Sequence, residues 1–109
     1  MLMDKKRETL CRLLDCYGPA LRDRCRDVLE YYYADDLSLA EISENTGITR
    51  QGVHDALRRG EAELLALENA LGMAAKTEKL LSIAERIATL GEEGKAYASE
   101  LARVLTDND

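Results

Sequence analysis

Residues 37–61, LSLAEISENTGITRQGVHDALRRGE, contain the pattern of a helix-turn-helix unit. Ser38 is a good N-cap, and Glu41 three residues later completes a capping box, so a short helix is expected to begin here. Gly47 stands where a sharp turn requires a positive φ, and Thr49 caps a second helix. The buried face of that second helix is predicted by three apolar residues at helical spacing: Val53, Ala56 and Leu57. Together these features are typical of a helix-turn-helix.

The second helix of this unit carries polar side chains away from its apolar face. Residues 49–60 contain three arginines and one aspartate, a local charge of +2 in a chain with a formal net charge of -6. Arg and Gln read guanine and adenine edges in the major groove, and Arg also neutralises phosphate. We therefore predict a nucleic-acid-binding surface formed by Thr49, Arg50, Gln51, His54, Asp55, Arg58 and Arg59. The alternative is a merely solvated helix face.

Apolar spacing predicts two helices before this unit. The first is expected over about residues 4–17, ended by Gly18 and Pro19, with an apolar face formed by Leu10, Leu13, Leu14 and Tyr17. The second is expected to end at the tyrosine run of residues 31–33, with one or two rings buried and one at the surface. Residues 1–26 carry seven basic and four acidic side chains. Because the whole chain would repel a polyanion, such a partner must meet a local patch.

The rest of the chain predicts a helical extension. Leu57, Leu64 and Leu71 recur every seven residues, so the second helix of the unit is expected to continue to about Leu71, with a break at Gly72. Beyond the break we expect two apolar stripes, separated by Gly91 and Gly94. The first comprises Leu80, Ile83, Ile87 and Leu90, and the second comprises Ala98, Leu101, Ala102 and Leu105.

These stripes suggest how the chain is organised. We divide it into a helix-turn-helix domain over residues 1–60 and a helical extension over residues 61–109. The leucine repeat up to Leu71 and the two stripes beyond Gly72 make three further apolar stripes. A chain of 109 residues cannot easily bury all three on a four-helix domain, so we predict a homodimer formed through residues 60–105. A two-fold dimer would place two recognition helices about one helical turn apart on a duplex.

The composition excludes several classes of protein. The chain is 46% hydrophobic and 33% charged, with five Tyr and neither Phe nor Trp, which indicates a small, acidic, mostly α protein with an aliphatic core. One Pro and seven Gly argue against a β-sandwich or barrel. No stretch is typical of a signal peptide or a membrane span, so we expect a cytoplasmic protein with no membrane partner.

Residues for catalysis or metal binding are scarce. Three cysteines, Cys11, Cys16 and Cys25, lie at spacings that suit neither a zinc site nor a disulfide framework, and we expect them to be small buried hydrophobes. With His54 as the single imidazole and no phosphate-cradling glycine loop, an enzyme has little support. No cofactor and no metal are expected.

Two runs of the sequence resemble the YlxM-type family of small bacterial proteins: residues 31–44, YYYADDLSLAEISE, and residues 47–55, GITRQGVHD. The helix-turn-helix of that family is similar to region 4 of sigma-70-type factors. The resemblance therefore implies an all-α, sigma-region-4-like bundle, here with a C-terminal helical extension. The residues that match the family's recognition-helix pattern are Thr49, Arg50, Gln51, Val53 and Asp55, whereas Gly52 stands where Ala is usual and His54 where Tyr is usual.

The same resemblance implies a function. Proteins of this family are encoded beside signal recognition particle genes and are regarded as regulators of that protein-targeting pathway. The resemblance thus implies that this protein is a non-enzymatic regulator of the pathway's components. We expect this regulator to bind double-stranded DNA through a recognition helix at about residues 50–60. The acidic charge favours an alternative, an adaptor that keeps the scaffold and docks a protein or ribonucleoprotein of the pathway.

Overall fold

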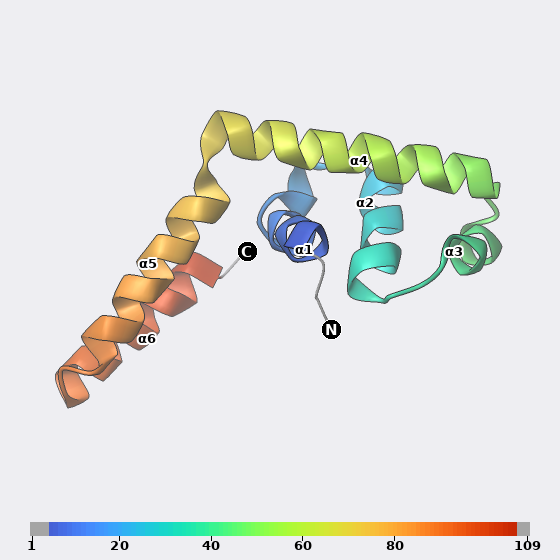
Figure 1. The fold of residues 1–109 in the computed structure, drawn as a ribbon. Coiled ribbons are helices and arrows are strands. Elements are labelled where there is room, and N and C mark those ends of the chain that lie inside the picture. The colour runs from blue at the N-terminus through green and yellow to red at the C-terminus, as the bar shows by residue number, and fades with distance from the viewer. Residues whose placement is uncertain (1–4, 107–109) are drawn as a thin grey trace. The chain divides into compact units, whose positions relative to one another are not determined.

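The computed structural model describes residues 5–106, and over this range the chain is all-α, as expected (Figure 1). The contacts divide it into two compact units, Met1–Leu71 and Gly72–Asp109. The first unit contains α1 (Lys5–Tyr17), α2 (Asp23–Leu29), α3 (Leu39–Thr46) and α4 (Arg50–Leu71), with a 3-10 turn, η1 (Gly18–Ala20), after α1 and a π turn, η2 (Glu30–Ala34), after α2. The second contains α5 (Met73–Ala88) and α6 (Glu92–Thr106).

The core of the first unit lies between α4 and the three helices before it. Figure 1 shows α1, α2 and α3 on the same side of α4, and all three contact it. The apolar side chains at helical spacing fill this space, because they lie on the inward side of each helix. The largest fully buried side chains are Leu10, Val28, Leu29, Ile42, Val53 and Leu64.

Gly60 allows α4 to approach α2 closely. A Cβ atom on residue 60 would lie 2.6 Å from Cδ1 of Leu29 and 3.6 Å from Cβ of Cys25. Leu64, one turn further along α4, is also fully buried. The expected domain boundary after residue 60 therefore falls within a continuous packed helix, and the two units meet at Leu71 and Gly72 instead.

The tyrosine run ends the second helix as a π turn. The amide of Asp35 donates to the carbonyl of Glu30 at 3.0 Å, a bond across five residues. Tyr31, Tyr32 and Tyr33 are all half-buried, so the expectation of one surface ring beside buried ones was wrong. Tyr32 and Tyr33 line the same pocket, and Tyr31 does not.

The second unit is a hairpin of α5 and α6, joined by residues 89–91. The α6 stripe is buried or half-buried as expected, but the predicted α5 stripe is not the hairpin's core: Leu80 is 41% exposed, Ile83 45% and Leu90 78%. Small side chains form the core of the hairpin in place of this stripe, because the two helices lie close together. A Cβ atom on residue 94 would collide with the carbonyl oxygen of Ile87. Gly94 is thus a packing position inside α6, not a break. The buried residues are Ala74, Ala84 and Ala98.

Candidate nucleic-acid interface

The first helix of the helix-turn-helix begins with the predicted capping box. The hydroxyl of Ser38 accepts a hydrogen bond from the amide of Glu41 at 3.1 Å, and the amide of Ser38 donates to the carboxylate of Glu41 at 2.9 Å. This backbone hydrogen bond lowers the pKa of Glu41. Two of the free amides at the start of α3 are satisfied in this way, which fixes where the helix begins.

The turn between α3 and α4 is held by side-chain oxygens of α3. Gly47 adopts the left-handed conformation with φ 76°, as expected, and its amide donates to the carbonyl of Ser43 at 2.9 Å. The hydroxyl of Ser43 donates to the carbonyl of Ile48 at 2.5 Å. The hydroxyl of Thr46 donates to the carbonyl of Ile42 and accepts from the amide of Ile48. The turn therefore sets the direction in which α4 leaves α3.

The start of α4 explains the glycine at position 52. Oγ1 of Thr49 accepts a hydrogen bond from the amide of Gly52 at 3.0 Å, so Thr49 caps the helix as predicted. A Cβ atom on residue 52 would lie 2.6 Å from Cγ2 of Ile48 and 3.1 Å from Oγ1 of Thr49. Glycine at this position lets the corner residue and the cap pack against the first turn of the helix.

The structure brings the seven predicted contact residues together on the solvent side of the start of α4. All seven are exposed, while Val53, Ala56 and Leu57 on the opposite side are buried. The amide group of Gln51 donates to the carboxylate of Asp55 at 3.1 Å, one turn along. Both side chains of this pair are exposed. The exposed set is Thr49, Arg50, Gln51, His54, Asp55, Arg58 and Arg59.

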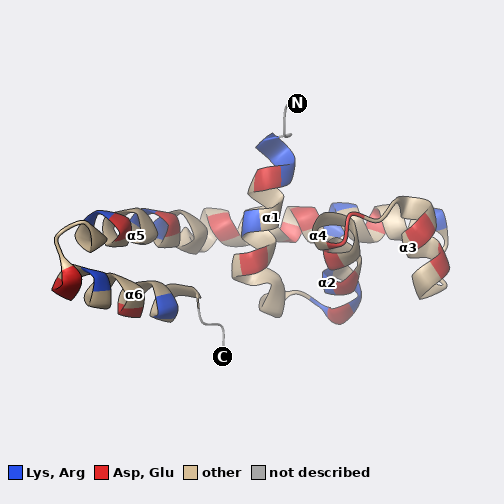
Figure 2. Ribbon diagram, turned by 90° about the horizontal axis from the view of Figure 1, so that it is seen from below, with Lys and Arg blue, Asp and Glu red and all other residues tan. Residues whose placement is uncertain are grey.

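A pocket of about 330 Å³ adjoins this surface, and the sequence pattern did not predict it. His54 and Arg58 of α4 line it together with Lys6 and Arg7 of α1 and two of the three η2 tyrosines, Tyr32 and Tyr33. Figure 2 shows that the start of α1 is basic. In the sequence, the pocket was indicated only by the excess of basic residues in residues 1–26. Nothing in the spacing along the chain connects residue 6 with residue 58, because only the packing of α1 on α4 makes them neighbours.

The wall of the pocket is tied to α4 by a tyrosine. The hydroxyl of Tyr33 donates to a carboxylate oxygen of Glu61 at 2.6 Å. Burial, followed by this hydrogen bond, raises the pKa of Tyr33 well above its usual value, because both favour the neutral phenol. Further along α4, the hydroxyl of Tyr17 donates to Glu68 at 2.6 Å. Two phenols therefore fasten α1 and η2 to the same helix.

Comparison with known proteins assigns the fold to a family. A family model described as "Putative helix-turn-helix protein, YlxM / p13 like", UPF0122, matches residues 4–104. The chain belongs to this family. The resemblance seen in residues 31–55 is thereby confirmed.

Individual relatives of this UPF0122 chain are similar at about 40% identity. A UPF0122 protein of Caldanaerobacter subterraneus subsp. tengcongensis is 45% identical over 75 residues, which cover 69% of this chain and 64% of the relative. One of Symbiobacterium thermophilum is 38% identical over 80 residues, 73% of this chain and 75% of the relative. One of Desulforamulus reducens is 42% identical over 87 residues, which cover 77% of this chain and 74% of the relative. The first match thus spans less than two thirds of its relative's length.

The thiols and carboxylates of this UPF0122 chain are dispersed. Within residues 5–106 no three His, Cys, Asp or Glu side chains are grouped so that they could hold a metal ion. Cys25 is buried as expected, but Cys11 and Cys16 are only half-buried, because they flank the apolar face of α1 rather than lie on it. Burial and the nearby Glu68 carboxylate raise the pKa of Cys16. Between residues 5 and 106, every helix is too short or too polar to span a bilayer.

Proposed function

We propose that this protein is a non-enzymatic, cytoplasmic DNA-binding regulator that acts through α4 on components of the signal recognition particle pathway. The observation that carries the proposal is the exposure of all seven candidate side chains on a capped helix whose direction is set by the α3–α4 turn. The link to the targeting pathway rests on the resemblance of residues 31–55 to the YlxM-type family.

Each side chain has a role in the proposed complex. Arg50 and Gln51, in the first turn of α4, would contact base edges in the major groove, where Arg pairs with guanine and Gln with adenine. Arg58 and Arg59 lie two turns further on and would neutralise phosphates, which fixes the register of the protein on the duplex. His54 would stack or read a base, and Asp55 would hold the Gln51 amide in position through their hydrogen bond.

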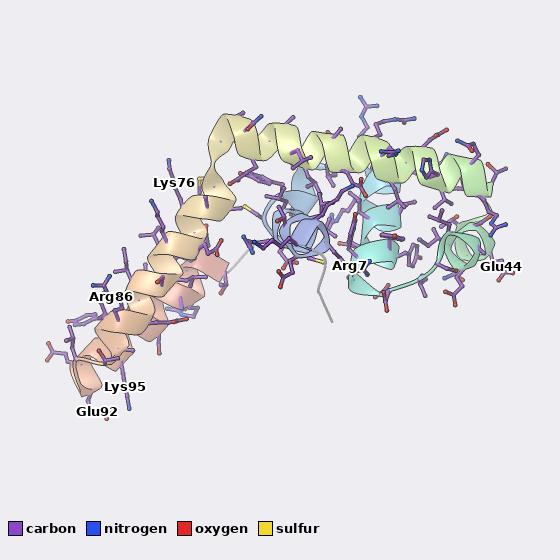
Figure 3. The ribbon with its side chains drawn as sticks, in the orientation of Figure 1. Arg7, Glu44, Lys76, Arg86, Glu92 and Lys95 are labelled. Carbon is purple, nitrogen blue, oxygen red and sulfur yellow. The ribbon has the colours of Figure 1, made fainter. Side chains whose placement is uncertain are left out.

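Arg50→Ala is expected to weaken duplex binding about tenfold, because one good side-chain contact to a base is worth ~1–3 kcal/mol of discrimination. Fluorescence anisotropy would be measured with duplexes from upstream of the chain's own operon and of genes for targeting components. Arg86→Ala is the matched control, since Arg86 is an exposed arginine on α5 (Figure 3). The log–log salt dependence should have a slope of about -0.9 per phosphate contacted. No detectable binding of any such fragment at low salt contradicts the proposal.

The acidity of the chain favours a second candidate, an adaptor that docks a protein or ribonucleoprotein. Residues 61–109 carry five basic and ten acidic side chains, which makes this part of the chain a poor surface for a polyanion. Capture of partners from lysate with and without nuclease separates the two candidates. A stoichiometric protein partner retained after nuclease treatment would favour the adaptor, and loss of the captured material on DNase treatment would favour the regulator.

We also propose that the chain forms a homodimer through residues 60–105, with the α5–α6 hairpin as the main contact. Among residues 5–106, eight large apolar side chains are exposed, and six of them lie in residues 73–104: Met73, Leu80, Ile83, Leu90, Tyr97 and Val104. A unit of fewer than about 40 residues rarely buries enough apolar surface to be stable alone, and a second copy would cover this one. The predicted α5 stripe would then lie between protomers rather than inside one.

The double variant Leu80→Glu, Ile83→Glu is expected to be monomeric, because two carboxylates cannot be buried unpaired at an apolar contact. Sedimentation at micromolar concentration should show twice the 12.2 kDa chain mass for the unmodified protein and the single mass for the variant. Ser82→Glu, an exposed polar position on the same helix, should remain dimeric. An unmodified protein that sediments only as a 12.2 kDa species rules out the dimer.

A further inference from the structure

The pocket beside α4 brings charged and aromatic groups together from four segments of the first unit. It is lined by Lys6 and Arg7 from α1, by Tyr32 and Tyr33 from η2, by Leu39 from α3, and by residues of α4. Its volume of about 330 Å³ is at the lower end of the ~300–1,000 Å³ typical of small-molecule sites. A pocket of this volume has room for one nucleotide and not for a length of duplex.

The charge of the lining favours an anion. Lys6, Arg7 and Arg58 contribute three positive charges and Glu61 one negative charge, in a chain whose formal net charge is -6. The carboxylate of Glu61 already accepts a hydrogen bond from the hydroxyl of Tyr33. Arg7 is paired with the Asp36 carboxylate at 2.9 Å, so Lys6 and Arg58 against Glu61 leave an excess of one positive charge, which suits a phosphate group.

The aromatic wall of the pocket is fixed in place. The Arg7 guanidinium lies 5.3 Å from the ring centroid of Tyr32 and 5.2 Å from that of Tyr33, and the two rings meet edge to face with centroids 4.9 Å apart. Nη2 of Arg7 donates to the carbonyl of Tyr32 and to the carboxylate of Asp36, each at 2.9 Å; Figure 3 labels this side chain. Guanidinium planes and tyrosine rings are the groups on which unpaired bases stack.

We propose that this pocket binds a single unpaired nucleotide. The base would stack on the Arg7–tyrosine wall, against Leu39 and Leu57, and the phosphate would lie between Lys6 and Arg58. Because the wall is already ordered by hydrogen bonds, little side-chain freedom is lost on binding. The inference goes beyond duplex reading by α4. Arg58 serves in both proposals, so Tyr32→Leu, which changes the pocket and none of the seven duplex residues, is the variant that separates them. The nucleotide comes either from solution or from a single-stranded nucleic acid.

The experiment compares binding of three probes to the full chain: the four 5′-mononucleotides, single-stranded DNA and RNA decamers, and a blunt duplex. Arg58→Glu and Tyr32→Leu change the lining. Arg24→Glu and Tyr31→Leu are their matched controls, since Arg24 is an exposed arginine of the same unit and Tyr31 precedes Tyr32 in η2, and neither lines the pocket. Binding is followed by amide chemical shifts and by anisotropy, and far-UV circular dichroism checks that each variant is folded.

We expect Arg58→Glu and Tyr32→Leu each to weaken single-strand binding about tenfold, the size of effect that removal of one stacking or charged contact produces. Both controls should bind as the unmodified chain does. Binding of mononucleotides with shifts at Arg7 and Tyr33 identifies a free nucleotide as ligand, and binding of the decamers alone identifies a strand. The inference is overturned if neither the mononucleotides nor the decamers bind, if only the blunt duplex binds, or if Arg24→Glu and Tyr31→Leu weaken binding as much as their partners do.

Discussion

Leu64→Ala is expected to lower the free energy of unfolding of the first unit by about 2–5 kcal/mol, the range for truncating a buried leucine. Leu64 is 0% exposed. It lies one turn beyond Gly60, where α4 and α2 approach each other closely, so the surrounding helices cannot easily collapse into the space it leaves. A stability loss of this size is a large fraction of what a small domain possesses.

The measurement is hydrogen exchange of the amides of α1, α2 and α4, combined with urea denaturation. Leu65→Ala is the matched control because Leu65, the next residue on the same helix, is 49% exposed. It should change the free energy of unfolding by less than about 0.5 kcal/mol, as surface substitutions do. Equal losses in the two variants would mean that α4 beyond residue 60 is not part of the first core.

Gly94→Val is expected to destabilise the α5–α6 hairpin by about 1–3 kcal/mol, because a Cβ on residue 94 would collide with the main-chain carbonyl of Ile87. Helix propensity alone predicts the opposite sign, since Val is more favourable than Gly inside a helix. The sign of the effect therefore tests the close approach of the two helices.

Hydrogen exchange should show faster opening of α5 and α6 in Gly94→Val, with the protection of α2 and α3 unchanged. Ser99→Val is the control, since Ser99 is exposed on the same helix. It introduces the same β-branched side chain at an exposed position. If Gly94→Val is as protected as the unmodified chain, α6 does not pack on α5 at this position.

The parts of the fold that the sequence predicts are those fixed by neighbours along the chain. Ser38 and Glu41 are three residues apart and cap each other, and the positive φ of Gly47 follows from the turn it occupies. The leucine spacing and Gly72 predict the end of α4 at Leu71, and in the structure Gly72 adopts a left-handed conformation. The exposure of Arg50 and Gln51 followed from the opposite position of Val53 on the helix.

The parts that the sequence did not predict depend on which elements meet. Leu80 and Ile83 have ideal spacing for a buried stripe, but the close contact at Gly94 selects the alanines of α5 instead. The pocket was missed because Arg7 and Arg58 are brought together only by the packing of α1, η2 and α4. Apolar spacing identifies a face of a helix, and it does not say what covers that face.

The unbroken course of α4 also sets a length scale. Its 22 residues span about 33 Å at 1.5 Å per residue. Arg50 lies in the first turn of this helix, and the hairpin follows its last residue. The two are therefore joined by a rigid helix and not by a flexible linker. An engineered chain could replace the residues beyond Gly72 with a different domain and leave the first turn of α4 unchanged.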